Sequence, residues 1–364
     1  MEAALRRHKM KAGIFDPYLD TMGGGERYCL TLAEALLAKG WQVDVFWPTK
    51  EILPKLQDKF QLKIEKINFV DYAPWRKTLC QRWQFEKNYD LLFYLSDGSV
   101  PFMFGRKNWL HFQVPFKSLH RSFLNQVKLG RINQVIVNSI FTKKVVDRGL
   151  GISSKVIYPP VDIVPLKPLQ KENLILSVGR FSQLLQKKRH DVLVEVFKNL
   201  IDGCHLKGWR LILAGGSEVG GGAFAAELRR KAEGYPIEIR ENPSFEELVK
   251  LYGKAKIFWT ASGYEIDEER EPARVEHFGM TTVEAMASGA IPIVQGKGGQ
   301  KEIVEENKNG FWWQEKSELI TKTLELIKNF RELSRLAKEA QMRSQDFAKE
   351  KFYEKVYDLL SRGD

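Results

Sequence analysis

The sequence predicts an α/β protein of two consecutive domains, each built on a parallel sheet covered by helices. The chain has 364 residues, more than one hydrophobic core normally organises. Short apolar runs alternate with amphipathic stretches along the chain, as in parallel sheets flanked by helices. A proline-rich segment separates two rounds of this alternation. We therefore expect two sheets that face a ligand across a cleft with the carboxyl ends of their strands.

The first round ends at a proline-rich linker. Five apolar runs are expected to be strands, at residues 11–16, 41–47, 90–96, 108–114 and 134–139. A helical pattern from Glu26 to Lys39 connects the first two of them. The stretch YPPVDIVPLKPLQKEN, residues 158–173, carries four prolines and is the best linker candidate.

The second round repeats the alternation. Five further strands are expected, at residues 173–179, 209–215, 237–240, 256–262 and 291–295. Residues 316–361 show helical periodicity throughout. We place a first domain at 1–165, a second at 166–340, and in 341–364 a helix that packs back on the first domain.

Positive charge is concentrated in the first half of the chain. Residues 1–165 hold 25 Lys and Arg against 15 Asp and Glu, a net of +10 out of +11 for the whole chain. Such a surface attracts anionic lipid or nucleic acid, or is simply solvated. The sequence has neither zinc-finger spacing nor a basic-aromatic binding signature, so we expect no nucleic-acid partner.

Composition is typical of a cytoplasmic protein. The opening MEAALRRHKMKAGIFD runs from basic residues into a strand-like stretch, without the apolar segment of a secretory signal. Cys29, Cys80 and Cys204 are widely spaced, which fits neither a disulfide framework nor a zinc site.

Two loops at expected strand ends could bind an anion. Gly23, Gly24 and Gly25 lie between a strand and a helix, where backbone amides can approach a ligand, although glycines there are also common in ordinary turns. Arg180 follows another strand, and Lys187 and Lys188 precede a helix. These cations could bind phosphate, or could belong to a solvated basic loop.

The stretch EHFGMTTVEA, residues 276–285, places two carboxylates around an expected helix N-terminus. Glu284 could close a capping box with Thr281. That interpretation leaves Glu276 unexplained, because it precedes the helix by several residues. Gly279 lets the backbone approach a ligand, and free amides follow it. Acids and amides together suit a sugar nucleotide.

The joint pattern resembles glycosyltransferase family four, retaining enzymes with the GT-B fold of two Rossmann-like domains. Glu276 and Glu284 fit its E-x7-E motif, and EHFGMTTVEAMASGAIPIV, GGQKEIV and NGFWW match its donor block. The stretches VNSIFTKKVV, VIYPPVD and SVGRF match other family segments in the expected order. The block also resembles mannosyltransferases that extend lipid-linked acceptors.

The resemblance assigns roles to individual residues. The first domain would bind the acceptor and the second the sugar nucleotide. Arg180 and Lys188 would hold the donor diphosphate, Glu284 the ribose hydroxyls, and Glu276 the hydroxyls of the transferred sugar. The donor contacts would be completed by Gly23, Gly24, Lys187 and the amides of Phe278, Gly279, Met280 and Thr281. His111 would lie near the transferred sugar as a catalytic candidate, although a histidine there can also be purely structural.

Two departures from the family pattern stand out. Arg189 follows Lys188 where the family commonly has glycine, so which of residues 187–189 touches phosphate stays open. The segment GYEIDEEREPARVEH, residues 263–277, is long and charged. We interpret its acid run as a solvated loop, with contact to an acceptor or partner as the alternative.

The chemistry expected is a metal-independent hexosyl transfer. The sequence contains no Asp-x-Asp triplet, so basic side chains and helix amides would stabilise the leaving diphosphate, and no cofactor is expected. GDP-mannose is the favoured donor and a UDP-sugar the alternative; residues 240–242 would neighbour the base. The acceptor would be a hydroxyl of a glycan or lipid-linked glycan, reached by peripheral attachment to the cytoplasmic face of an anionic membrane.

Two other functions stay open. A sugar-nucleotide epimerase of the same fold would convert its donor without an acceptor. A non-catalytic sugar-binding subunit would lack one of the donor groups, and all four of Arg180, Lys188, Glu276 and Glu284 are present.

Overall fold

The computed structural model describes residues 9–182, 186–203, 205–217 and 221–362. The expectations that rest on the first eight residues and on Cys204 lie outside this part of the chain. The chain divides into two compact units. The first is Met1–Pro160 with Phe352–Asp364, and the second is Val161–Lys351. The division falls within the proline-rich segment, five residues before the boundary placed at residue 165.

The first unit is built on a seven-stranded parallel sheet in the order β3-β2-β1-β4-β5-β6-β7. Its strands are β1 Lys11–Phe15, β2 Gln42–Phe46, β3 Asn68–Val70, β4 Leu91–Leu95, β5 Lys107–Phe112, β6 Gln134–Val137 and β7 Lys155–Val156. The five strands expected from the sequence are confirmed. The other two, β3 and β7, have three and two residues and too little pattern to be recognised.

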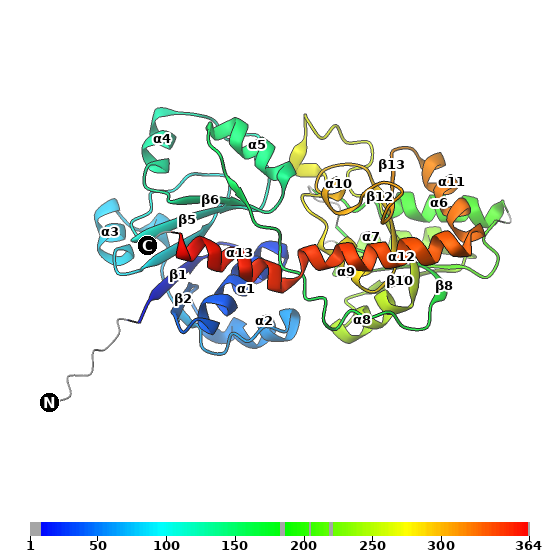
Figure 1. Ribbon diagram of the computed structural model, residues 1–364, viewed down its shortest axis with the longest axis horizontal. Helices are drawn as coiled ribbons and strands as arrows, with labels where there is room; N and C mark the ends of the chain where they lie inside the picture. The colour runs from blue at the N-terminus through cyan, green and yellow to red at the C-terminus, as the bar shows by residue number, and fades with distance from the viewer. Residues whose placement is uncertain (1–8, 183–185, 204, 218–220, 363–364) are drawn as a thin grey trace. The chain divides into compact units, whose positions relative to one another are not determined.

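Five helices connect these strands (Figure 1). They are α1 Gly24–Ala38, α2 Leu53–Phe60, α3 Leu79–Glu86, α4 Phe123–Leu129 and α5 Ile140–Leu150. Short 3-10 turns lie at Leu19–Thr21, Lys50–Ile52 and Pro74–Arg76. Helix α1 is buried along most of its length because apolar residues cover nearly its whole circumference.

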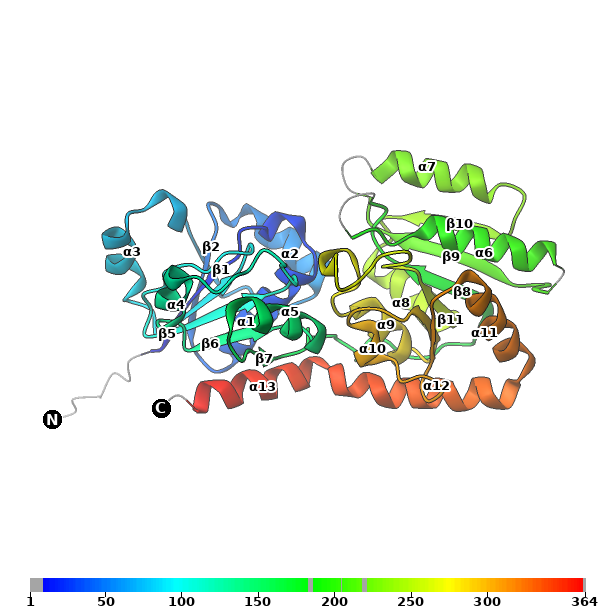
Figure 2. The ribbon, with the colours of Figure 1, turned by 90° about the horizontal axis from the view of Figure 1, so that it is seen from above.

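The second unit contains a six-stranded parallel sheet in the order β10-β9-β8-β11-β12-β13. Its strands are β8 Glu172–Val178, β9 Arg210–Gly215, β10 Ile237–Glu241, β11 Ala255–Thr260, β12 Ile291–Gln295 and β13 Phe311–Trp313. Its helices are α6 His190–Asp202, α7 Gly221–Ala232, α8 Phe245–Lys254, α9 Met280–Ala287, α10 Gln300–Ile303, α11 Lys316–Lys328 and α12 Phe330–Ser344. Helix α7 packs beside β10 at one edge of the sheet (Figure 2).

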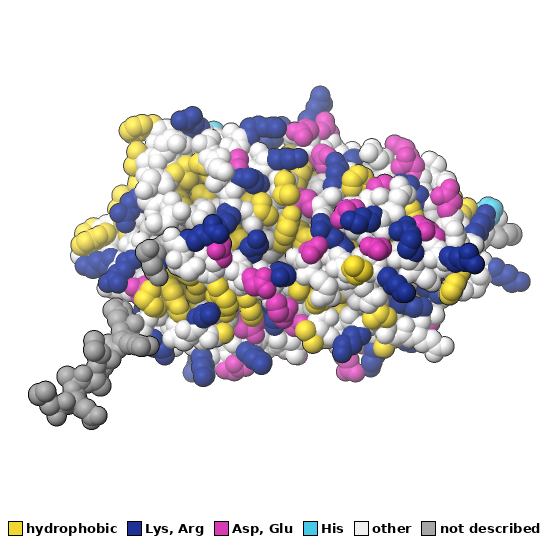
Figure 3. All heavy atoms as spheres, in the orientation of Figure 1, with side chains coloured by type: hydrophobic (Ala, Val, Ile, Leu, Met, Phe, Trp, Pro, Cys, Tyr) yellow, Lys and Arg dark blue, Asp and Glu magenta, His cyan; other side chains and the backbone are white. Residues whose placement is uncertain are grey.

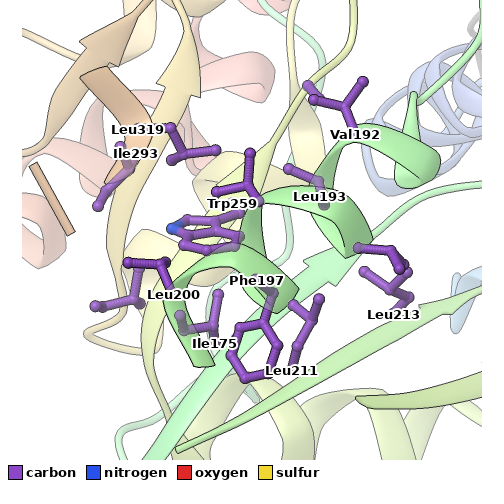
Figure 4. Packing of buried hydrophobic residues seen from close by; sticks show 14 of the residues in the cluster. Ile175, Val192, Leu193, Phe197, Leu200, Leu211, Leu213, Trp259, Ile293 and Leu319 are labelled. Carbon is purple, nitrogen blue, oxygen red and sulfur yellow. The ribbon is translucent and has the colours of Figure 1, made fainter. Parts of the chain in front are cut away.

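The core of the second unit forms around Trp259 of β11, whose side chain is fully buried. Phe197 of α6 meets it edge to face, with ring centroids 6.4 Å apart. Branched aliphatic residues from the strands and α6 fill the space around the two rings (Figure 4). This packing anchors β8 and β11, whose carboxyl ends lead into the site described below.

The last part of the chain is helical in three pieces, and the expectation of one uninterrupted helical stretch at 316–361 is wrong in two places. Asn329 ends α11 and caps α12 by accepting a hydrogen bond from the Glu332 amide at 3.1 Å. After a 3-10 turn at Gln345–Phe347, Ala348 is extended and pairs with Val161. Helix α13, Lys349–Ser361, follows this break.

Helix α13 packs on the core of the first unit. Phe352, Val356 and Leu359 are buried in its main hydrophobic cluster. The Phe352 ring meets Tyr28 of α1 edge to face at 4.9 Å. The Tyr353 hydroxyl donates to the Glu34 carboxylate, and that of Tyr357 to the Ala35 carbonyl at 3.1 Å.

Candidate functional site

The candidate site in the second unit centres on an ion pair between Glu276 and Lys188. The Lys188 ammonium donates to Oε2 of Glu276 at 2.6 Å. Only 18% of the lysine side chain and 14% of the glutamate side chain are exposed. The two residues are 88 positions apart in the chain, so the sheet must fold before they can meet.

The environment keeps Glu276 ionised. Burial alone would raise the pKa of its carboxyl, but the charge and hydrogen bond of Lys188, helped by His277 and Arg180, leave that pKa below its ordinary value. Arg180 lies exposed at the end of β8. The structure thus brings Arg180, Lys188 and Glu276 into one electrostatic group.

Two glycines hold the backbone of the Glu276 loop. The Gly299 amide donates to the Glu276 carbonyl at 2.8 Å. A Cβ on Gly298 would lie 2.1 Å from that same carbonyl oxygen, and one on Gly299 would lie 2.3 Å from the His277 carbonyl oxygen. Gly298 also has φ +58°. Only glycine permits this close backbone approach.

The charged segment before Glu276 is partly structural. One Glu268 oxygen accepts from the Gly298 amide at 2.6 Å and the other from Lys301 at 2.7 Å. Lys297 donates to the Gly263 and Ile266 carbonyls at 3.3 and 2.7 Å. The interpretation as a solvated loop is therefore wrong for Glu268, which supports the glycine pair. Nothing in the residue pattern distinguished it from its acidic neighbours.

Helix α9 begins at Met280, within the stretch 276–285 where the sequence predicts a helix N-terminus. Gly279 is its N-cap with φ +117°, and no side chain caps the helix. Gly279 packs against the buried Gln300, whose Oε1 accepts from the Thr282 hydroxyl at 3.0 Å. Thr281 is already inside the helix, so the capping-box interpretation of Thr281 and Glu284 is wrong. The Thr282 amide donates to the Gly279 carbonyl at 3.0 Å, whereas the amides before it precede the first carbonyl that the helix offers.

Glu284 instead accepts a hydrogen bond from the buried Tyr252 of α8, at 2.8 Å to Oε2. The tyrosine fixes the direction of the carboxylate on the first turns of α9. Its contribution was not foreseen, because residues 252 and 284 meet only through the packing of α8 on α9.

Close backbone packing also shapes the loop after β8. A Cβ on Gly215 would lie 1.9 Å from the Gly179 carbonyl oxygen. A Cβ on Gly179 would lie 2.8 Å from Cγ of Lys188, so the lysine stem runs directly over this glycine. The two glycines thereby let Lys188 reach Glu276.

The basic residues on either side of Lys188 contact other groups than Glu276. Arg189, at φ +51°, adopts the left-handed conformation that favours glycine, the residue type that the family resemblance leads us to expect at this position. Its side chain pairs with Asp191 and Glu265, at 3.3 and 3.0 Å. Lys187 lines a pocket of about 250 Å³ with Arg189, Tyr264 and others. Lys188 is therefore the one that meets Glu276.

The glycine-rich loop of the first unit forms the capped N-terminus of helix α1. Gly23 is the N-cap of α1 and Gly24 its first residue. The buried Glu26 carboxylate accepts from the Gly23 amide and from the Thr21 hydroxyl, the latter at 3.0 Å. A Cβ on Gly25 would lie 3.3 Å from Leu95 and 3.7 Å from Gln113.

His111 is fully buried in β5. Its Nε2 donates to Oε1 of Gln113 at 2.9 Å, and its ring stacks on Tyr28 with centroids 4.0 Å apart. Its Nδ1 has no hydrogen-bond partner among the described residues. Burial lowers the pKa of His111 to about 4, against the opposing hydrogen bond of Gln113, so the ring is neutral at pH 7.

Asp16 is a further titratable group that sequence reasoning missed. It directly follows β1 and is 1% exposed, with Oδ1 accepting from the Tyr18 amide at 2.9 Å. Burial, and then the charge of Glu26, raise the pKa of Asp16. An acid at the last position of a predicted strand, before Pro17, is the signal that could have found it.

Among the described residues, no group of three or more His, Cys, Asp or Glu side chains is arranged to hold a metal ion. Within the same part of the chain, no helix has both the length and the apolar character needed to cross a bilayer. Cys29 and Cys80 are free thiols.

Comparison with known sequences gives two adjoining family matches. The family described as "Glycosyl transferases group 1" matches residues 162–343, half of the chain. The family described as "Glycosyltransferase Family 4" matches residues 22–164. The boundary between the matches falls in the proline-rich segment between the two units.

The curated relatives include mannosyltransferases. The GDP-Man:Man(3)GlcNAc(2)-PP-Dol alpha-1,2-mannosyltransferase of Xenopus laevis is 30% identical over 176 residues, 43% of this chain and 33% of that protein. The enzyme of the same name from Dictyostelium discoideum is 26% identical over 233 residues, 57% of this chain and 43% of that protein. The chain therefore spans less than half the length of these relatives.

Solved structures share the fold. HepE of Anabaena, in complex with UDP and glucose, matches 97% of this chain and 100% of its own with a TM-score of 0.72 and 19% identity. A glycosyltransferase from Rickettsia africae matches 97% of this chain and 98% of its own with a TM-score of 0.74 and 17% identity. Both family matches and both sheets thus agree with the resemblance: the chain belongs to glycosyltransferase family four and has the GT-B fold.

Proposed function

We propose that the protein is a retaining, metal-independent hexosyltransferase that moves mannose from GDP-mannose to a hydroxyl of a glycan or lipid-linked glycan. The observation that carries this proposal is the Lys188–Glu276 ion pair beside the N-terminus of α9. It places a cation suited to a diphosphate next to a carboxylate suited to sugar hydroxyls.

The leaving diphosphate is the group that most needs stabilisation. Breaking the anomeric bond builds negative charge on it, and preorganised donors at that position are worth several kcal/mol in related chemistry. Arg180 and Lys188 supply two cations, and the amides of Gly279 to Thr281 supply the positive end of α9. These groups would stabilise the leaving diphosphate, as a divalent ion does in other transferases.

Lys188 would also control how Glu276 binds the sugar. In the free protein its ammonium occupies Oε2 of Glu276. A bound diphosphate would compete for this lysine and release acceptor positions on Glu276 toward the hexose hydroxyls. The low pKa of Glu276 ensures that the carboxylate is ionised when it accepts them.

Glu284 would bind the ribose. Its carboxylate offers about four acceptor positions, and the bond from Tyr252 fixes its orientation while using one of them. Beyond β10, Asn242 would be a neighbour of the base. Its side-chain oxygen accepts from the Ser217 backbone amide at 3.1 Å, and its own backbone amide donates to the Gly215 carbonyl at 2.8 Å. Arg240 is engaged with Glu238.

The choice of mannose and of a lipid-linked acceptor is supported by the relatives named as mannosyltransferases. A UDP-sugar is the alternative, since HepE was crystallised with UDP and glucose. The roles of Gly23, Gly24, Lys187 and His111 stay predictions. Because His111 is neutral and fully buried, it would act indirectly, through its hydrogen bond to Gln113, or only after the side chains around it rearrange.

A panel of nucleotide sugars tests this proposal. Thermal shifts are measured with GDP-mannose, UDP-glucose and the bare nucleotides, all in EDTA, and donor breakdown is followed by NMR with and without added glycan. We expect GDP-mannose to stabilise the protein most and to be consumed only with an acceptor. Conversion of the donor to its epimer without an acceptor would instead identify an epimerase, and the absence of any shift in EDTA would contradict metal independence.

A further inference from the structure

Two helices of the first unit leave much of their apolar surface outside its core, although Phe85 of α3 and Leu129 of α4 pack against core clusters. No residue of α4 is buried, and the only buried residue of α3 is Glu86. Six apolar side chains of these helices and of the 3-10 turn before α3 face the solvent: Trp75 from the turn, Leu79 and Trp83 from α3, and Phe123, Leu124 and Val127 from α4. We call these six residues the α3–α4 surface. Phe123 is 88% and Trp75 66% exposed, which is unusual for side chains of this size.

The two helices border the same segment of chain. Phe102 and Phe104 stack at 6.3 Å between them. Arg82 of α3 lies over the Phe104 ring at 5.9 Å, and Lys128 of α4 lies over the Phe102 ring at 5.4 Å. Both views show α3 and α4 at the same end of the first unit (Figures 1 and 2). The apolar side chains therefore belong to one neighbourhood.

The sequence around α4 carries charge of a single sign. Residues 98–146 contain no Asp or Glu. They contain eight basic residues, Arg106, Lys107, Lys117, Arg121, Lys128, Arg131, Lys143 and Lys144. Beside α3, Lys87 lies 4.1 Å from the Trp83 ring, while the acid Glu86 is buried and paired with Arg82. In the space-filling view, apolar side chains stand out at this end of the unit with Lys and Arg beside them (Figure 3).

We propose that the α3–α4 surface docks the protein on an anionic lipid bilayer. Exposed Trp and Phe side chains enter the interfacial layer, and flanking Lys and Arg meet anionic headgroups. A protein partner would need matching acids around an apolar centre. A bilayer supplies anionic charge and an apolar layer together, and it fits a surface spread over two helices and a loop. This proposal rests on the proposed function in that it brings the enzyme to a lipid-linked acceptor.

The test is flotation of the full chain with phosphatidylcholine vesicles, with and without phosphatidylglycerol. We expect the wild type to bind only the anionic vesicles, and binding to fall as salt is raised. The variant Phe123→Ser with Leu124→Ser should partition at least about tenfold more weakly, because two apolar side chains no longer enter the interface. The matched control is Phe330→Ser with Met342→Ser, two exposed side chains of the second unit, which should bind like the wild type.

A pair of charge-reversal variants measures the electrostatic contribution to vesicle binding. Arg121→Glu with Lys128→Glu should weaken binding about tenfold or more, since each near-surface charge is worth about a factor of five. Lys328→Glu with Lys338→Glu, the same change on exposed lysines of the second unit, should leave it unchanged.

Three results would overturn the proposal: no binding of the wild type to anionic vesicles, equal binding by the Phe123/Leu124 variant and its control, or a lipid-free dimer in sedimentation that this variant converts to monomer. The last result would assign the surface to a second copy of the chain. Thermal shifts with GDP-mannose on the same samples keep the two proposals apart. Vesicle binding without a donor shift would contradict the proposed function alone, and a donor shift without vesicle binding would contradict the membrane surface alone.

Discussion

Lys188 connects the two halves of the proposed chemistry, since it holds Glu276 in the free protein and would hold the diphosphate in the complex. We predict that Lys188→Ala and Glu276→Gln each lower kcat by roughly 100- to 1000-fold, the usual loss when one preorganised electrostatic group is removed. Both variants should keep the fold, because the site is partly open to solvent. Turnover of GDP-mannose and circular dichroism check the two statements.

The matched control for this pair is Lys250→Ala. Lys250 pairs with Glu246 at 2.8 Å on the exposed face of α8, in the same unit as Lys188. Exposed pairs of this kind contribute little to stability, so activity and stability should both stay near those of the wild type. Wild-type rates in Lys188→Ala and Glu276→Gln would contradict the assignment of the site.

His111 gives a residue-scale prediction about pH. Its pKa is about 4 in the folded chain against about 6.5 in an unfolded one. Between these values the unfolded state binds more protons, so the free energy of unfolding falls as pH drops below about 6.5 and continues to fall to about 4, by up to roughly 3 kcal/mol. Ring nitrogen NMR shifts should show a neutral His111 at pH 5.5, and the same ring in urea should be protonated. A protonated ring in the folded protein would contradict the burial described here.

At the scale of elements, the site depends on loops that hold α9 and the Glu276 loop at the carboxyl ends of β8 and β11. Glu268 binds the Gly298 amide, and Gly298 and Gly299 lie against the Glu276 loop. This chain of contacts uses backbone atoms at nearly every step. A side chain added at either glycine must therefore move the loop that carries the carboxylate.

We predict that Gly298→Ala destabilises the protein by roughly 2–4 kcal/mol, because its Cβ meets the Glu276 carbonyl and its φ is positive. The displaced carboxylate should cost about 100-fold in kcat/KM. Urea unfolding and steady-state kinetics measure the two effects.

The control for this substitution is Gly222→Ala in the first turn of α7, where a Cβ meets nothing within 4 Å. Alanine there should be neutral or stabilise by up to about 1 kcal/mol, with unchanged turnover. If both alanine variants behave alike, the Glu276 loop does not depend on the glycine pair.

The sequence predicted those elements that carry their own pattern. All ten expected strands are present, and α9 begins within the stretch 276–285 where a helix N-terminus is expected. What it could not predict depends on contacts between distant residues. Strands β3 and β7 are too short to show a hydrophobic period. The hydrogen bond between Tyr252 and Glu284 requires α8 to pack on α9. Glu268 differs from its solvated acidic neighbours only through its hydrogen bond with the Gly298 amide, which the sequence does not show.

At the scale of the whole molecule, each unit closes its own core, and the chain returns to the first unit at Phe352. Phe352 is 3% exposed and packs against Tyr28, which itself stacks on His111. The last helix therefore supports the layer that contains the candidate histidine.

We predict that Phe352→Ala lowers the stability of the first unit by about 3–5 kcal/mol, the range for a large aromatic side chain removed from a core. Hydrogen exchange should accelerate in α1 and β5 and stay unchanged in the sheet of the second unit. Met342→Ala, an exposed position on α12, is the control and should change stability by less than about 0.5 kcal/mol. Equal exchange in α1 for both variants would contradict the docking of α13.

Calorimetric titration with GDP-mannose in EDTA, on the wild type, Lys188→Ala and Lys250→Ala, is the most direct test of whether fixed basic groups receive the donor. We predict that the wild type and Lys250→Ala bind with the same Kd, and that Lys188→Ala binds at least about tenfold more weakly, the loss of one charge-assisted contact. Unchanged affinity in Lys188→Ala, or binding that appears only when a divalent ion is restored, would contradict the account.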